Sequence, residues 1–225
     1  MELERDGLHR QFGGGIPKGA VMVLVGAFGS GKSAVCQRLL YGFLKNGHSA
    51  TLISTEFTTR GFIEQMKSLE YNIVTYLLNR ALLYIPVYPL IGKVRERGDF
   101  LGRLMESKVL YERDILLIDT FSSLVKHDID MSRAIKALSL FKKLVAKNKT
   151  IILTIEEGEL PPEILYPFQS DTEIYTTIKT RIIEGTTNRI LHINRYTGSR
   201  YPVVELTGFR VEPKIGFIID ITTVA

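Results

Sequence analysis

The sequence has one cysteine and four scattered histidines among its 225 residues. A single thiol, Cys36, cannot form a disulfide within the chain, and the histidines show no spacing typical of metal ligands. We therefore expect no disulfide, no structural metal, and a reducing, cytoplasmic environment for the protein. Cys36 itself is expected to pack as a small hydrophobic side chain.

Long apolar runs are also lacking. The run at residues 20–25 is too short to cross a bilayer, and the run at 75–91 is interrupted by Asn79, Arg80 and prolines, whereas a spanning helix needs about 18 apolar residues. Residues 1–12 carry charges of both signs and lack the apolar centre of a secretory signal. We expect any membrane contact to be peripheral.

Neither sign of charge dominates the composition. The 29 lysines and arginines outnumber 24 acidic residues, for a net charge of +5, which permits nucleic acid or anionic lipid as a partner but indicates neither. A hydrophobic content of 45% and a charged content of 24% are typical of a globular chain with a buried core. The length suits a single domain over residues 1–225.

Short apolar segments rich in β-branched residues alternate with segments of helical spacing. Strands are predicted at residues 21–25, 50–54, 82–85, 115–118 and 150–155. Helices are predicted at 32–46, 61–69, 100–111 and 130–147, with Thr58 and Thr59 as capping candidates for the second and Asp130 for the last. The last helix is expected to bury one face made of Ile135, Leu138, Phe141 and Val145. This alternation predicts an α/β fold with a mainly parallel sheet flanked by helices.

The pattern changes beyond residue 171. Segments at 173–183, 189–196, 201–206 and 217–222 are rich in β-forming residues and separated by turn residues. They predict C-terminal antiparallel strands that extend the sheet.

A phosphate-binding loop stands between the first predicted strand and the first predicted helix. Its sequence, Gly-Ala-Phe-Gly-Ser-Gly-Lys-Ser, fits the pattern Gly-x-x-x-x-Gly-Lys-Ser/Thr. The glycines let the backbone turn sharply and aim N–H groups at phosphate oxygens, reinforced by the helix N-terminus. The lysine is expected to reach the β- and γ-phosphates, and the last serine to bind Mg²⁺. The expected nucleotide-binding residues of this loop are Gly26, Ala27, Phe28, Gly29, Ser30, Gly31, Lys32 and Ser33.

Two acidic residues follow predicted strands. Asp119 ends the aliphatic strand at 115–118, from which a carboxylate can orient the Mg²⁺ shell; capping the next turn is the alternative role. Glu56 follows the strand at 50–54 and is the candidate catalytic base that polarises a water toward the γ-phosphate. The alternative for Glu56 is a surface glutamate that favours a helix start.

Several motifs in order carry a family resemblance: the glycine-rich segment at 13–19, the loop at 26–33, Thr55-Glu56 and Leu117-Ile-Asp119. The chain resembles the RecA/KaiC-like ATPases and, over nearly its whole length, their FlaH family, the accessory ATPases of the archaellum (archaeal flagellum). Stretches at 41–47, 76–80, 149–154 and 216–221 extend the likeness. The resemblance implies a RecA-like P-loop NTPase fold, ATP and Mg²⁺ as cofactors, and a hexameric ring. The implied partners are the motor ATPase of archaeal motility and membrane platform or scaffold proteins, with no nucleic acid.

The resemblance also implies roles for single residues. Lys32, Ser33 and Asp119 carry over as nucleotide and Mg²⁺ ligands. Glu56 matches the first of two adjacent glutamates in KaiC-type domains, but the second position is Phe57, so ATP hydrolysis is expected to be slow or undetectable.

Two further positions bear on the nucleotide. Glu156 stands where relatives often carry histidine or another polar group that senses the γ-phosphate, and a carboxylate there is expected to repel phosphate. Arg195 resembles the basic residue of a KaiC-type strand-turn that reaches the neighbouring subunit's nucleotide; a solvated surface arginine is the alternative.

These features favour an ATP-binding regulatory component of the archaellum motor, a switch that responds to nucleotide rather than a fast motor. The alternatives are a RecA-like recombinase or recombination regulator acting on single-stranded DNA, or another KaiC-like signalling ATPase. Residues 156–171, expected to form a loop, hold five acidic residues and no lysine or arginine. Because DNA-binding loops need basic groups, the recombinase ranks second.

Overall fold

A single mixed sheet organises the chain. The computed structural model describes residues 1–87, 99–183 and 186–220, and within them nine strands follow the order β3-β2-β4-β5-β1-β6-β7-β8-β9. Strands β1 to β6 are parallel to their neighbours, and β6 to β9 pair in antiparallel fashion. The strands are β1 (Val21–Gly26), β2 (Ala50–Ser54), β3 (Leu82–Pro86), β4 (Ile115–Asp119), β5 (Thr150–Glu156), β6 (Ile174–Ile183), β7 (Thr186–Tyr196), β8 (Leu206–Glu212) and β9 (Gly216–Ile219).

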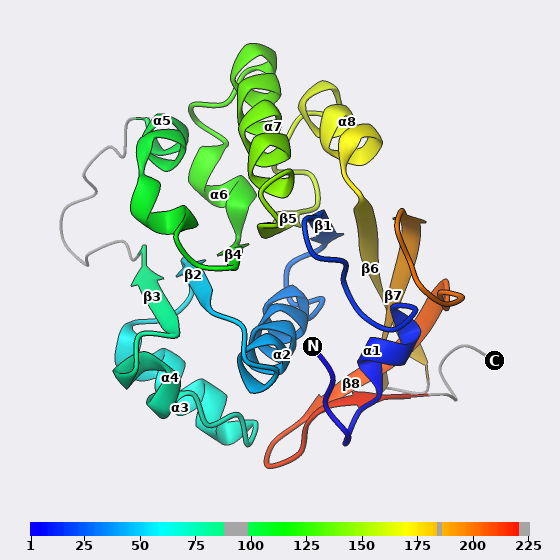
Figure 1. Cartoon of the computed structure of the whole chain (residues 1–225). Coiled ribbons are helices and arrows are strands. Elements are labelled where there is room, and N and C mark those ends of the chain that lie inside the picture. The colour runs from blue at the N-terminus through cyan, green and yellow to red at the C-terminus, as the bar shows by residue number, and fades with distance from the viewer. Residues whose placement is uncertain (88–98, 184–185, 221–225) are drawn as a thin grey trace, which may run out of the picture.

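Helices cover both faces of the sheet. Figure 1 shows α1 to α4 on one face and α5 to α8 on the other. They are α1 (Leu8–Gln11), α2 (Lys32–Lys45), α3 (Thr59–Ser68), α4 (Val74–Leu78), α5 (Phe100–Glu106), α6 (Phe121–Val125), α7 (Met131–Val145) and α8 (Pro162–Asp171). In the described part of the chain, none of the helices is long and apolar enough to cross a membrane.

The central strand β1 supplies side chains to both hydrophobic cores. Successive side chains of a strand point to opposite faces. Met22 and Leu24 therefore join the core beneath α2, whereas Val21 and Val23 join the core beneath α7. All four are inaccessible to solvent, which explains why this strand is uniformly apolar.

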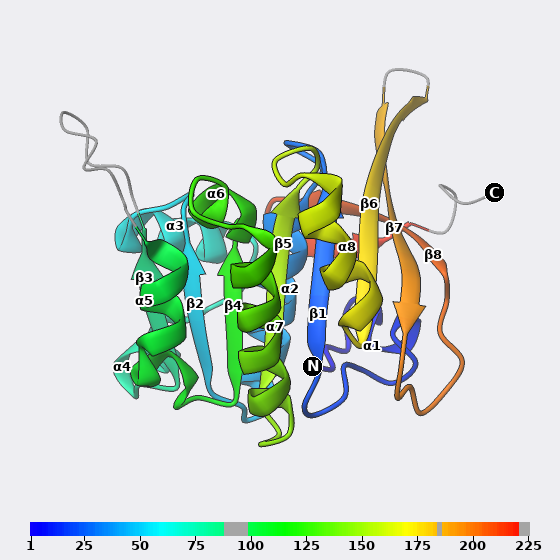
Figure 2. The same cartoon turned by 90° about the horizontal axis from the view of Figure 1, so that it is seen from above.

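The register of the parallel strands brings their carboxyl ends to one edge. Gly26 at the end of β1 pairs with Glu156 at the end of β5, and Ser54 of β2 pairs with Asp119 of β4. Figure 2 shows this edge, beyond which the hairpin of β6 and β7 extends. The loop after β1 and the acidic residues after β4 and β5 therefore share one crevice.

The α/β prediction, with its parallel core and antiparallel extension, is confirmed. The five strands predicted before residue 156 and the caps Thr58 and Asp130 are present, and each cap accepts a hydrogen bond from the third residue after it. Residues 88–91 of the apolar run and residues 221–222 of the last predicted strand lie outside the described residues.

Two helix predictions were wrong in detail. The helix expected at 100–111 ends at Glu106, because Ser107 is extended, and a short 3-10 helix, Lys108–Tyr111, follows. In α7, Ile135 is 53% exposed, and Ala134, Ala137, Leu138 and Phe141 form the buried face. Ile135 lies about 100° around the helix from Ala134, and the small alanines let the helix approach the sheet.

Two further predictions failed near the C-terminus. Of the strand predicted at 201–206, residues 201–205 do not form a strand; Tyr201 and Val204 instead donate backbone hydrogen bonds to Gly13 and Gln11 of the N-terminal segment. The strand, β8, follows at Leu206–Glu212. The acidic segment 156–171 contains α8 despite Pro167, because Ile164 and Phe168 of that helix are buried against the sheet.

Candidate nucleotide-binding site

The loop between β1 and α2 has the backbone of a phosphate cradle. Gly29 and Gly31 have positive φ angles of 73° and 98°, which glycine adopts without strain. A Cβ atom on Gly31 would lie 3.2 Å from both Arg189 and Phe209. The N-terminus of α2, which begins at Lys32, directs unpaired backbone N–H groups toward the loop. The loop therefore has the backbone conformation that a phosphate cradle requires.

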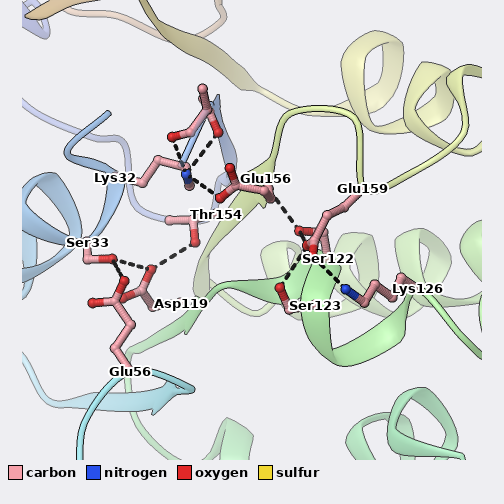
Figure 3. Close-up of polar contacts among 12 residues, drawn as sticks. Lys32, Ser33, Glu56, Asp119, Ser122, Ser123, Lys126, Thr154, Glu156 and Glu159 are labelled. Atoms are coloured by element: carbon pink, nitrogen blue, oxygen red, sulfur yellow. Dashed lines mark hydrogen bonds and ion pairs between the residues drawn. The ribbon is translucent and has the colours of Figure 1, made fainter. Parts of the chain in front are cut away.

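The ammonium of Lys32 lies inside this loop. It donates hydrogen bonds to the carbonyl oxygens of Gly26 at 2.8 Å and Ala27 at 2.9 Å, and to Oε2 of Glu156 at 2.7 Å. Figure 3 shows the carboxylate reaching Lys32 from the end of β5. Sequence reasoning placed Glu156 near the phosphates as a repelling charge and did not foresee that it pairs with the lysine.

Ser33 links the two predicted acidic residues. Its hydroxyl lies 2.8 Å from Oε1 of Glu56 and 3.2 Å from Oδ1 of Asp119, and Thr154 donates to the same Asp119 oxygen at 2.9 Å. Burial, and secondarily the Glu56 carboxylate, raise the pKa of Asp119 to about 7. Asp119 does not cap the next helix, since α6 begins after Thr120 without a side-chain cap. A hydroxyl and two carboxylates are oxygen ligands of the kind that Mg²⁺ prefers, so this donor set fits that ion.

A second polar cluster, centred on Glu159, adjoins the loop. Glu159 accepts hydrogen bonds from the hydroxyls of Ser122 and Ser123 and from Lys126. Burial opposes ionisation of Glu159, but these three donors outweigh it and lower its pKa. No local sequence pattern predicted this cluster, because its members come from α6, from the residue just after α6, and from the turn after β5.

These groups surround one cavity of about 530 Å³, lined by Lys32, Ser33, Glu56 and Glu159 among others. Nucleotide-sized ligands occupy cavities of roughly 300–1,000 Å³, so the volume suits a nucleotide. Phe28 in the loop is 94% exposed and lies at its rim.

Arg195 lies away from this cavity in the same chain. It pairs with Tyr175 near the start of β6, and its guanidinium donates to the carbonyl of Ser170. Arg189, near the start of β7, is the residue that packs against Gly31. Its Nε atom is buried and has no hydrogen-bond partner within the described residues. Both arginines lie on β7, but at different positions along the strand, so that only Arg189 reaches the phosphate loop.

A phosphate cradle on the central strand of a largely parallel sheet, with an acidic residue ending a nearby strand, defines a P-loop nucleotide-binding protein of the RecA-like fold. The family model of the KaiC ATPases matches residues 5–214. The chain belongs to this KaiC ATPase family and, within it, to the FlaH proteins.

Individual relatives support this assignment. The archaeal flagellar ATP-binding protein FlaH of Methanocaldococcus jannaschii is 38% identical over 100% of this chain and 97% of its own length. That of Methanococcus voltae is 37% identical over 100% and 98%. The crystal structure of flagellar accessory protein FlaH from M. jannaschii superimposes with a TM-score of 0.91, covering 98% of this chain and 97% of that one. A KaiC-like protein from Pyrococcus horikoshii, 16% identical with a TM-score of 0.74 over 98% and 99%, shares the fold.

Proposed function

We propose that this protein is a regulatory ATP-binding component of the archaellum motor and its assembly machinery. One observation carries the proposal: the Lys32 and Ser33 cradle stands against Asp119 and Glu56 at the carboxyl edge of the sheet. Relatives that match the whole chain bear the name archaeal flagellar ATP-binding protein, which supports the cellular setting.

Each site residue has a proposed role. The backbone of residues 26–33 cradles the phosphates, and Lys32 neutralises charge on the β- and γ-phosphates. Ser33 and Asp119 would hold Mg²⁺, which supplies positive charge to the phosphate oxygens. Glu56 would orient a water toward the γ-phosphate.

We propose slow or undetectable hydrolysis because the second acidic position is Phe57. Its side chain packs against the core beneath α2, and its carbonyl accepts a hydrogen bond from Tyr84 at 2.7 Å. Glu56 therefore acts without the adjacent carboxylate of KaiC-type pairs. A site that holds ATP for long periods suits a switch, since differential contacts with ATP and ADP shift an assembly without rapid turnover.

The proposed assembly is a hexameric ring in the cytoplasm, held at the membrane only through partners. Arg195 would reach the nucleotide of the neighbouring subunit. This role is compatible with its position, because Arg195 does not line the cavity of its own chain. The partners proposed are the archaellum motor ATPase and membrane platform or scaffold proteins, with no nucleic acid.

Binding and capture experiments with Lys32→Ala test this function. The wild-type protein should bind a fluorescent ATP analogue and, loaded with ATP, retain the purified archaellum motor ATPase of the same organism. Lys32→Ala should keep its fold by circular dichroism but lose both. Unchanged nucleotide affinity in the folded variant, or capture of the motor ATPase that ignores nucleotide, would overturn the proposal.

A further inference from the structure

The ammonium of Lys32 already has a full set of partners within the chain. A lysine ammonium has three N–H donors, and Lys32 directs them at Gly26, Ala27 and Glu156. Two of these acceptors are neutral carbonyl oxygens of the loop itself. Only the carboxylate of Glu156 supplies a negative charge, as a phosphate oxygen would.

The Lys32–Glu156 pair is largely shielded from water. The side chains are 6% and 19% exposed, so their attraction is screened less than that of a surface pair. Glu156 is also held in place by its backbone, because Gly26 and Glu156 are partners in the ladder between β1 and β5. Its amide donates to the hydroxyl of Ser122 at 2.8 Å.

We propose that Glu156 is an internal competitor of the nucleotide phosphates. In the nucleotide-free protein, its carboxylate takes the place on Lys32 that a phosphate oxygen takes when nucleotide binds. Binding then transfers Lys32 from Glu156 to phosphate. The charged hydrogen bond to the phosphate is therefore gained at the loss of the charged hydrogen bond between Lys32 and Glu156. We call this pair the Lys32–Glu156 latch; the inference rests on the ATP-binding role proposed above.

The latch connects the nucleotide to α6. Ser122, which accepts from the Glu156 amide, donates its own hydroxyl proton to Glu159 at 2.7 Å. The amide of Glu157 donates to the Gly26 carbonyl at 3.1 Å, the same oxygen that Lys32 contacts. The turn at residues 156–159 is therefore hydrogen-bonded to the phosphate loop on one side and to α6 on the other. Release of Glu156 would loosen the first of these attachments.

A neutral, equally shaped residue at position 156 tests the latch. Glu156→Gln should bind the fluorescent ATP analogue about 10-fold more tightly than the wild type, because the competing ion pair is gone and charged hydrogen bonds are stronger than neutral ones. Glu157→Gln is the matched control, since it removes the same charge from the adjacent residue, whose side chain is exposed. Its affinity should stay within about twofold of the wild type, as expected for a screened surface charge.

The possible results separate the latch from the proposed function. If the wild type binds nucleotide, Lys32→Ala does not, and Glu156→Gln is no tighter, the latch is wrong and the ATP-binding role stands. If the wild type binds no nucleotide, the function itself fails. Should Glu156→Gln not fold, Glu156→Asp replaces it: the shorter side chain withdraws the carboxylate from Lys32 and should also tighten binding, and failure to do so would overturn the latch.

Amide exchange tests the connection to α6. Adding ATP to the wild type should speed exchange at residues 156–159, and nucleotide-free Glu156→Gln should already exchange at the faster rate. Equal exchange with and without ATP at these residues would overturn a latch that opens on binding.

Discussion

Arg38 and Asp6 form a bidentate ion pair from which water is excluded. Nε of Arg38 lies 2.9 Å from Oδ2 of Asp6, the second contact is 2.5 Å, and both side chains have no exposed surface. Arg38 lies on α2, the helix that follows the phosphate loop. The pair therefore fixes the N-terminal segment against the helix that carries Lys32.

Breaking this pair should destabilise the fold. Asp6→Asn keeps the shape but leaves the buried guanidinium without a negative charge, which costs about 3–5 kcal/mol of unfolding free energy. Urea denaturation measures this. Glu64→Gln, which breaks the exposed Arg60–Glu64 pair, should change the stability very little, because water screens a surface ion pair. Similar losses in the two variants would contradict a structural role for the buried pair.

Gly31 should be irreplaceable for a reason beyond its backbone angle. Gly31→Ala adds a methyl group against Arg189 and Phe209 at a φ of 98°, whereas Gly47→Ala has a φ of 79° with open space around the new carbon. Both should pay the left-handed strain of roughly 1–2 kcal/mol. Only Gly31→Ala should also weaken ATP binding, as measured by titration. Equal affinity in both variants would show that the loop tolerates the methyl group.

Steady hydrolysis should be slow. We expect phosphate release far below the typical enzymatic rate of about 10 per second, because Phe57 replaces the second acid. Glu56→Gln should lower any residual rate by about 100-fold, the usual contribution of a general base. Release near the typical rate that disappears in Glu56→Gln would show that one glutamate suffices.

Asp114 should make stability depend on pH in the acidic range. The backbone N–H of Ser49 donates to its carboxylate at 2.9 Å and is the main cause of its lowered pKa. A carboxyl whose pKa is lower in the folded state stabilises the fold above its unfolded pKa, and loses that effect as pH falls through the folded pKa. The stability advantage of the wild type over Asp114→Asn should therefore be present at pH 7, begin to fall near the ordinary aspartate pKa of about 3.9, and vanish only below the lower pKa of the folded state. A constant difference in urea midpoint across this range would refute the assignment.

ATP should favour ring assembly through Arg195. If its guanidinium reaches the phosphates of the next subunit, light scattering should show larger oligomers with ATP than with ADP, and smaller ones for Arg195→Ala. Nucleotide affinity of the monomer should survive the substitution. Normal ATP-dependent assembly by Arg195→Ala would limit this residue to its contact with Ser170.

Local patterns sufficed for the sheet and the cradle. Uninterrupted aliphatic runs predicted the parallel strands, and the glycine spacing predicted the loop before α2. Local patterns failed where a competing contact decided the structure. Residues 201–205 are rich in β-forming residues, but Tyr201 and Val204 form hydrogen bonds with the N-terminal segment instead. β8 was missed because Gly208 interrupts its pattern.

The site itself was only partly predictable. Ser33, Glu56 and Asp119 could be brought together from the rule that parallel strands end at one edge. The contact of Lys32 with Glu156, and that of Arg189 with Gly31, depend on strand register across the sheet. Register is set by packing over the whole sheet, so no segment of sequence specifies it alone.

The strand order has a consequence for how the chain acquires its activity during synthesis. β1 carries the phosphate loop, yet its only partners in the described sheet are β5 and β6. A growing chain therefore exposes both edges of this apolar strand until residues far along the sequence have left the ribosome, a condition that favours aggregation. ATP cannot assist the early steps, because Asp119 at the end of β4, and the strands β5 and β6 that hold β1 in place, are made only later. Nucleotide can stabilise this protein only once most of the chain has been made.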